Sequence, residues 1–311
     1  MASKFTGVQW RWLLVTCLIL LCFGNLTAVT IPIWQEDETT RKLWDTGFLQ
    51  KRPASNKAKK SIAPPKYKRA TPPLNASDAA ADAMIGITVW RLRPSKATDE
   101  ARILLYKKDS KQADEWTPER IESDTPLAKG QRVRLSIEVP RAGFLYVIDR
   151  EQYADGTLSE PYLVYPILSS RNGDNTVSAG RVIEIPPQDD DRSYSYFELE
   201  PLPRSNQPEQ VSEMLTIIVT PEKLGNLKIG REPLLLSKEQ VSGWEKKWGA
   251  QIERIELVDG AGKAYTAAEK AAGANPSQRL TSDDPLPQTI FRVAAKPGDT
   301  LLVNVPLRIG K

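Results

Sequence analysis

The stretch Gln131-Arg132-Val133-Arg134-Leu135-Ser136-Ile137-Glu138-Val139 decides the fold class, because polar and apolar residues alternate along it. Successive side chains of a β-strand point to opposite faces, so this pattern predicts a strand with one buried face. After the turn residues 140–143, the run 144–149 is apolar on both faces, which is typical of a central strand. We expect 131–139 and 144–149 to pair as a hairpin.

Similar short runs occur on both sides of this pair, each bounded by Gly, Pro, Asn or Asp. A stretch with Pro118 near its start, 116–124, is expected to be a helical turn or a loop. Many short strands separated by turns are typical of a sandwich, so the sequence predicts a mainly β fold, an immunoglobulin-like β-sandwich. The further expected strands are 85–92, 101–106, 162–166, 181–186, 194–199, 213–219, 288–293 and 300–307.

One or two short helices are expected in the C-terminal part. Ser237 stands three positions before Gln240, the spacing of a helix cap and its partner, which predicts a helix near 238–250. Thr266 and Glu269 repeat the spacing before 267–272, and Gly273 is the expected end of that helix. The segment 296–299 is predicted to be a hairpin turn between the last two strands. We expect these strands to rejoin the same sheets, so that a β-sandwich domain at 84–224 carries the extension 225–311 packed against it.

The N-terminus has the pattern of a secretory signal, because Lys4 and Arg11 precede an apolar run at 12–23. Ala28 offers a cleavage position, so 1–28 is expected to be a signal peptide. An uncleaved anchor over 12–34 is the alternative. Both place the rest of the chain outside the cytoplasm, periplasmic or secreted, and membrane contact is expected only through the uncleaved segment. The basic stretch 51–69 opposes this orientation under the positive-inside rule.

The segment 29–83 has no apolar periodicity and is expected to be a disordered basic linker. The first 83 residues hold 12 Lys/Arg against 6 Asp/Glu, so the net charge of +4 belongs to this part of the chain. The alternatives are a plain tether and a basic arm that touches anionic lipid or polymer. No nucleic-acid partner is expected, because the remaining chain is slightly acidic.

Four runs in the β region resemble a bacterial family called domain of unknown function 4384: GQRVRLSIEVPRAGFLYVIDRE from Gly130, DGTLSEPYLVYP from Asp155, NTVSAGRVIEIP from Asn175 and EMLTIIVTPEKL from Glu213. The resemblance covers about 84–224, and the later residues resemble C-terminal extensions found with such domains. It implies an extracytoplasmic or membrane-linked accessory module, of a type often attached to signalling or protease-like modules. It implies no catalytic residues.

Several kinds of chemistry are disfavoured by composition. The chain has no histidine, the usual general base and metal ligand, and its two cysteines, Cys17 and Cys22, lie in the apolar run. No phosphate-binding glycine loop occurs, and Asp189-Asp190-Asp191 lacks the spacing of a calcium loop. We therefore expect no metal site, no cofactor and no catalytic residues of these types.

Two hypotheses about function remain. The first is a non-enzymatic accessory or interaction module of the bacterial cell envelope that binds another envelope protein or a polymer. The second is a carbohydrate-active hydrolase that uses two carboxylates, for which the strand residues Asp149, Glu184 and Glu198 are candidates. Aromatic side chains on a sandwich face can stack on ligands, although most aromatic residues are core. The candidate surface for a ligand or partner is Trp90, Tyr162, Tyr165 and Tyr194.

Overall fold

The chain divides into two units, Met1–Gln35 and Glu36–Lys311, and all structural statements concern the second unit. The apolar N-terminal run and Asp189–191 lie outside the described residues. A computed structural model describes residues 48–55, 66–72, 74, 83–106, 113–187, 196–199, 208–275 and 277–310.

The larger sheet is antiparallel and contains nine of the described strands. Six of them follow the order β1-β13-β14-β2-β4-β3, while β5 pairs with the other edge of β2 and carries β9 and β10. The long strand β2 can pair on one edge with both β14 and β4, because β14 uses its first half and β4 its second. The bounds are β1 Tyr67–Arg69, β2 Ala83–Pro94, β3 Ile103–Tyr106, β4 Ala113–Ile121, β5 Gln131–Glu138, β9 Val182–Ile185, β10 Phe197–Leu199, β13 Ile252–Leu257 and β14 Thr289–Val293.

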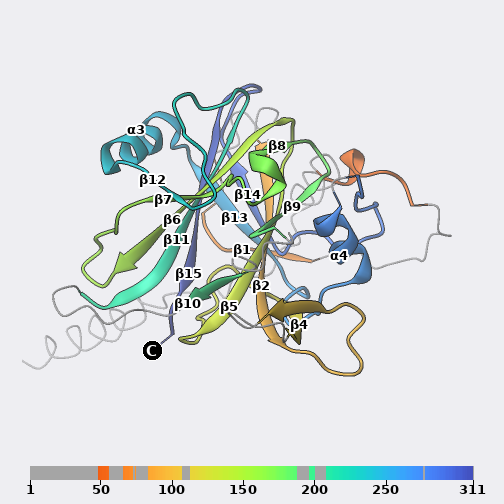
Figure 1. Ribbon diagram of the computed structural model, residues 1–311. Helices are drawn as coiled ribbons and strands as arrows, with labels where there is room; N and C mark the ends of the chain where they lie inside the picture. Colours follow the sequence, from red (N-terminus) through yellow and green to blue (C-terminus); the bar gives the residue numbers. More distant parts are fainter. Residues whose placement is uncertain are drawn as a thin grey trace, which may run out of the picture. The chain divides into compact units, whose positions relative to one another are not determined.

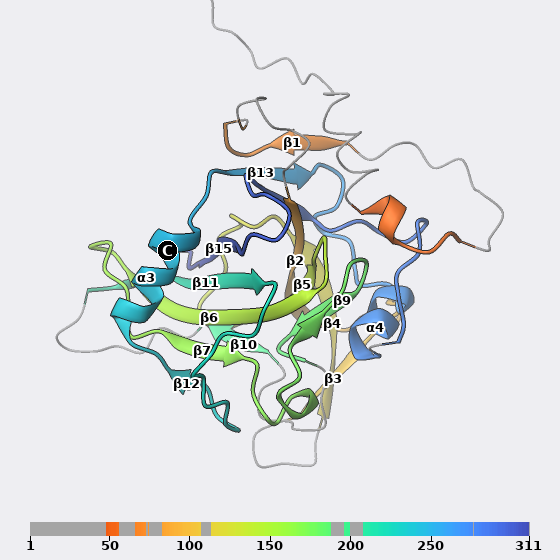
Figure 2. The same cartoon turned by 90° about the horizontal axis from the view of Figure 1, so that it is seen from above.

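The second sheet has six described strands in the order β12-β7-β6-β11-β15, with β8 paired to β6. Figure 2 shows β6 and β11 running across the direction of β2, so the strands of the two layers cross. The bounds are β6 Gly143–Tyr153, β7 Tyr162–Tyr165, β8 Thr176–Val177, β11 Gln210–Thr220, β12 Leu234–Leu235 and β15 Leu301–Arg308. Two short 3-10 helices, η1 Leu49–Lys51 and η3 Arg171–Gly173, lie outside the sheets.

The main hydrophobic core lies between the two sheets. Val133, Leu135 and Ile137 of β5 point into it, as the alternation in the sequence predicts, and Leu215 and Ile217 of β11 meet them from the other layer. All five side chains are fully buried. Burial of a Val, Leu or Ile side chain contributes about 1.5–3 kcal/mol, so this interface holds the layers together. The prediction of a mainly β, two-sheet fold is confirmed.

Two helices cover the outer faces of the sheets, one on each side (Figure 1). Helix α3, Lys238–Trp248, begins at Ser237, whose side chain accepts a hydrogen bond from Gln240 N, and packs with Val241 on the six-stranded sheet. Helix α4, Ala267–Ala274, has the predicted capping box of Thr266 and Glu269. It continues past Gly273, which we expected to end it. The helix approaches the nine-stranded sheet closely at this position, and glycine leaves room for that approach because it has no side chain. A Cβ on Gly273 would lie 2.3 Å from Glu184 Cδ.

Three local predictions are wrong. The strands β5 and β6 do not pair, since the turn between them carries the chain from one sheet to the other, and the same holds for β14 and β15. The expected loop around Pro118 is strand β4, because β2 and β3 pair with it on its two edges and override the local signal of the proline.

Two parts of the expected disordered linker are instead packed on the nine-stranded sheet. Strand β1 pairs with β13, and Phe48 is 2% exposed among Met84, Ile255 and other buried residues. Arg52 forms an ion pair with Glu138, in which both side chains are almost fully buried. Residues 48–52 and 67–69 therefore belong to the folded region.

Candidate functional site

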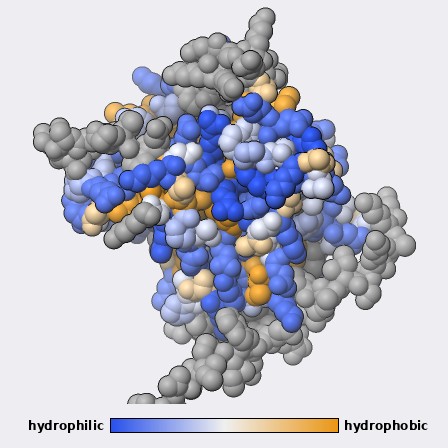
Figure 3. Space-filling model, turned by 90° about the horizontal axis from the view of Figure 1, so that it is seen from below, coloured by the Kyte–Doolittle hydropathy of each residue, from blue (hydrophilic) through white to orange (hydrophobic). Residues whose placement is uncertain are grey.

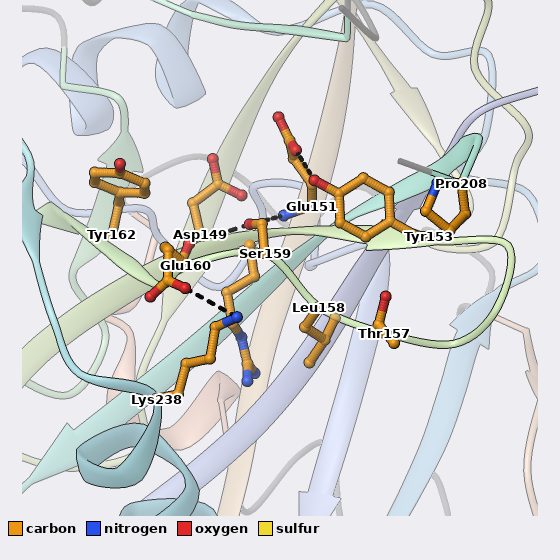
Figure 4. A pocket seen from close by; sticks show the side chains of 11 residues that line it. Asp149, Glu151, Tyr153, Thr157, Leu158, Ser159, Glu160, Tyr162, Pro208 and Lys238 are labelled. Carbon is orange, nitrogen blue, oxygen red and sulfur yellow. Dashed lines mark hydrogen bonds and ion pairs between the residues drawn. The ribbon is translucent and has the colours of Figure 1, made fainter. Parts of the chain in front are cut away.

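A cavity of about 370 Å³ opens beside the C-terminal half of β6. Its wall is a turn in which the chain after β6 folds back, with Tyr153 N donating to Thr157 O and Ser159 N to Glu151 O, both at 2.9 Å. Figure 4 shows the cavity from close by. The lining residues are Asp149, Arg150, Glu151, Tyr153, Thr157, Leu158, Ser159, Glu160, Tyr162, Pro208 and Lys238.

The register of β6 and β11 brings carboxyl groups together at this cavity. Asp149 lies opposite Leu215 and Glu151 lies opposite Glu213. Leu215 points into the core, so Asp149, Glu151 and Glu213 occupy the same, inner face of the six-stranded sheet. The apolar interior therefore changes into an acidic patch at this end of the sandwich.

Asp149 and Glu213 form a hydrogen-bonded carboxyl pair with raised pKa values. Burial raises the pKa of Asp149 to about 6, against the hydrogen bond from Glu213. Burial and then the negative charge of Asp149 raise the pKa of Glu213 to about 9. Two carboxyl groups this close cannot both ionise readily, so the pair shares one proton near neutral pH. Glu213 then holds that proton, and the Asp149 carboxylate accepts it in a hydrogen bond.

No N–H or hydroxyl group of the described residues donates to one oxygen of this pair. The Oδ1 atom of Asp149 is buried and has no hydrogen-bond partner in the described part of the chain. The two neighbouring carboxyl groups each accept a hydrogen bond. The Tyr153 hydroxyl donates to Glu151, and Gln210 Nε2 donates to Glu213 Oε1 at 2.7 Å. The proton on Glu213 is therefore the donor available to the buried Asp149 carboxyl group.

The rim of the cavity is aromatic and charged. Tyr162 of β7 lies directly opposite Asp149 of β6 and is 44% exposed. Leu235 of β12, 56% exposed, lies on the other side of Tyr162. Lys238, at the start of α3, forms an exposed ion pair of 2.9 Å with Glu160 across the opening. The rim thus offers an apolar shelf beside charged groups.

Large exposed apolar side chains are otherwise scattered over the described surface. Leu104 on β3 and Leu168 near η3 are examples that lie away from the cavity. On the face drawn in Figure 3, hydrophilic residues predominate and hydrophobic residues form short stretches between them. The pairing of Tyr162 with Leu235 at a cavity therefore distinguishes this rim from an ordinary surface.

Three of the four aromatic residues predicted to bind a ligand are described, and they lie in different environments. Trp90 is 2% exposed, its Nε1 donates to Ser136 at 2.7 Å, and Tyr265 packs against it edge to face. Tyr165 is fully buried, so it and Trp90 belong to the interior and these two predictions are wrong. Tyr194 lies outside the described residues. Of the three residues that the structure describes, only Tyr162 is on the surface, at the cavity.

The three carboxylates named as candidates for hydrolysis also lie in different environments. Glu184 forms a buried ion pair of 2.9 Å with Arg134, and Glu198 forms a partly exposed one of 3.3 Å with Arg132. Both have structural roles, whereas Asp149 lines the cavity. Sequence reasoning missed Glu151 and Glu213, although the even spacing of Asp149 and Glu151 along one strand already placed them on the same face.

Comparison of the chain with models of known families, with curated proteins and with solved structures finds no match. The resemblance to domain of unknown function 4384 accordingly stays a prediction. Within the described ranges, no group of three or more Asp, Glu, Cys or His side chains is placed to hold a metal ion. None of the helices in the described part of the chain is both long and apolar enough to cross a bilayer.

Proposed function

We propose that the chain is an exported accessory module of the bacterial cell envelope that binds a glycan polymer of that envelope at the cavity beside β6, without cleaving it. The observation that carries the proposal is the half-exposed Tyr162 directly opposite Asp149, at the mouth of the cavity. A flat aromatic ring next to carboxyl acceptors suits a sugar, which presents an apolar ring face and a rim of hydroxyl groups.

The protonation of the carboxyl pair supports this ligand class. Near neutral pH Glu213 keeps its proton and Asp149 is mostly ionised. The carboxyl groups of Asp149 and Glu151 line the cavity and can accept hydrogen bonds from ligand hydroxyl groups. The Lys238–Glu160 pair supplies a further donor and acceptor at the opening. A volume of about 370 Å³ suits one or two sugar rings of a longer polymer.

The extracytoplasmic location is proposed from the N-terminal sequence. Lys4 and Arg11 before the apolar run 12–23 are typical of export. The absence of any cysteine after Cys22 leaves the exported part insensitive to an oxidising compartment. The resemblance to domain of unknown function 4384 points to the same compartment.

A carboxylate hydrolase is the second candidate, because the pKa values of Asp149 and Glu213 are separated in the way that acid and base roles require. The geometry favours binding instead. Glycoside hydrolysis by two carboxyl groups needs a separation of roughly 5–9.5 Å, and hydrogen-bonded carboxyl groups are closer than that.

The test is co-sedimentation of the full-length chain, kept in a neutral detergent, with purified peptidoglycan sacculi. We expect the wild type to sediment with the sacculi and Tyr162→Ala to lose at least 90% of that binding, a tenfold change that corresponds to about 1.4 kcal/mol. Leu104→Ala is the matched control, since Leu104 is 55% exposed on the other sheet, and should bind like the wild type. Equal sedimentation of all three proteins, or of none, contradicts the proposal.

The same samples distinguish binding from hydrolysis. Release of reducing sugar ends by the wild type, lost in Asp149→Asn, would replace the binding proposal with the hydrolase. Sedimentation without any release supports the binding module.

A further inference from the structure

The segment 48–53 lies in a groove on the outer face of the nine-stranded sheet, on the same side of the molecule as α4 (Figure 2). It is one helical turn, closed by hydrogen bonds from Lys51 N and Arg52 N to Phe48 O. Their four-residue spacing places Phe48 and Arg52 on one side of this turn. Both side chains are buried, whereas Lys51 and Pro53 are exposed. The segment is therefore anchored by two inserted side chains.

The pocket around Arg52 offers hydrogen-bond acceptors from three parts of the chain. Both carboxylate oxygens of Glu138 accept from the guanidinium, and the main-chain carbonyls of Thr281, Asp284 and Pro285 accept from its Nη atoms at 3.1–3.4 Å. A guanidinium carries five N–H donors in a fixed plane, so it can satisfy this set, whereas an ammonium group has three donors on one atom. The buried carboxylate also requires a cation beside it. The pocket is thus selective for an arginine side chain.

Two glycines make room for the turn. The ring of Phe48 packs in a hydrophobic cluster with residues of β2, β13 and β14. A Cβ on Gly86 would lie 3.1 Å from Phe48 Cε1, and a Cβ on Gly180 would lie 2.7 Å from Lys51 O. Side chains at these positions would crowd the segment, so the groove is shaped for the turn that fills it.

The way in which the segment is held resembles the binding of a peptide ligand. Strand β1, the other packed part of the expected linker, pairs along β13 through its main chain. The segment 48–53 instead closes its own turn and inserts side chains, and Ser282 N donates to Pro53 O at its end. Anchor side chains on one face of a helical turn, seated in a groove, are a recurring mode of peptide recognition.

We propose that this groove is a recognition site for a peptide segment of a partner protein that carries Phe and, four positions later, Arg, and that residues 48–53 are its resident occupant. The arginine of the partner replaces Arg52 beside Glu138, so the buried carboxylate keeps a cation throughout. A tethered occupant has an effective concentration on the order of millimolar, so the resident segment excludes weaker ligands. The residues of this groove differ from those that line the cavity beside β6, so the peptide site is separate from the proposed glycan site.

The probe is a fluorescein-labelled peptide with the sequence of residues 45–56, DTGFLQKRPASN, whose binding is measured by fluorescence anisotropy. The protein is the full-length chain in neutral detergent, with a protease recognition sequence inserted between Asn56 and Lys57. Cleavage there removes the tether while every described residue stays unchanged. We expect the cleaved protein to bind the peptide with an apparent Kd at least tenfold lower than that of the uncleaved protein, because its resident segment has become an untethered competitor.

Variant peptides test the two anchors without altering the protein or its folding. Phe48→Ala and Arg52→Ala in the peptide should each raise the apparent Kd for the cleaved protein at least tenfold. Arg52→Lys should raise it at least fivefold, because an ammonium group cannot reach Glu138 and the carbonyls together. Gln50→Ala changes an exposed residue of the same turn, and this matched control should stay within twofold of the unchanged peptide.

The proposal is overturned if the cleaved protein does not bind the peptide, or if all the peptides bind it equally. Residues 48–53 would then be a permanent part of the fold. Dimers of the uncleaved chain that added peptide dissociates, measured by sedimentation velocity, would overturn the assignment to a partner protein and make a second copy the occupant. The glycan proposal does not depend on these results, since its assay reports on Tyr162 of the other sheet.

Discussion

Arg52 and Glu138 form an ion pair inside the protein although 86 residues separate them in the chain. Arg52 Nη2 lies 2.5 Å from Glu138 Oε1, and Arg52 Nε lies 3.1 Å from Oε2. The same guanidinium donates to the backbone carbonyls of Thr281, Asp284 and Pro285. The segment around Arg52 is therefore bound by the end of β5 and by the loop before β14.

The first prediction concerns this pair. Replacing Arg52 with alanine leaves Glu138 buried without its partner, which costs about 3–5 kcal/mol in other proteins. We expect Arg52→Ala to lower the free energy of unfolding by that amount in urea denaturation of the full-length chain. Arg102→Ala, which breaks a partly exposed pair with Glu115, should change it by less than about 1 kcal/mol. Similar losses in the two variants would mean that the segment does not dock in solution.

Two glycines, one against the segment around Arg52 and one in open space, test whether that segment is docked. Gly180 and Gly130 have nearly equal φ values of 72° and 73°, so alanine at either position costs about 1–2 kcal/mol of backbone strain. A Cβ on Gly180 would also lie 2.7 Å from Lys51 O, whereas a Cβ on Gly130 meets nothing within 4 Å. We expect Gly180→Ala to destabilise the protein by about 1–3 kcal/mol more than Gly130→Ala, measured by urea denaturation. Equal losses of stability in the two variants would show that the segment around Lys51 moves away from a side chain at position 180 without cost.

The sequence predicts those elements whose signal is local. Alternation over 131–139 places β5, and the side-chain caps at Ser237 and Thr266 place both helices, because each depends on residues a few positions apart. Pro118 misleads because the pairing of β4 with β2 and β3 outweighs the local preference.

The docked segment and the cavity depend on distant partners instead. Phe48 and Arg52 stand alone in a charged stretch with no periodicity, and their binding partners come from β2, β5 and the loop before β14. The carboxyl pair requires the register of β6 against β11, which no spacing in the sequence reveals. Asp149 could be named as a candidate, but Glu213 could not be assigned to it.

The pKa values at the cavity predict how stability depends on pH. The pKa of Glu213 is about 9 against its ordinary 4.5, so the folded protein holds a proton that the unfolded chain releases. This contribution to stability is complete below pH 4.5 and is lost as the pH rises through 9. Asp149 acts in the same direction between pH 3.8 and about 6.

Glu213→Gln should remove most of this dependence, because the amide stays uncharged and can still donate to Asp149 and accept from Gln210. We expect the variant to be more stable than the wild type at pH 9 and similar to it, within about 1 kcal/mol, at pH 5, by urea denaturation at both values. Glu198→Gln, at a partly exposed pair with Arg132, should follow the wild-type profile. Parallel profiles for Glu213→Gln and the wild type would refute the shared proton.

The assignment of aromatic residues to core and surface gives the last prediction. Trp90 is buried with its Nε1 bonded to Ser136 and Arg120 over its ring, so Trp90→Ala leaves a large cavity and should cost about 3–5 kcal/mol. Tyr162 is 44% exposed, so Tyr162→Ala should cost less than about 1 kcal/mol in the same urea denaturation. A large loss for Tyr162→Ala would identify the ring as structural, and weakened glycan binding by that variant would then no longer locate the ligand. A small loss, by contrast, lets the binding assay report on the rim of the cavity alone.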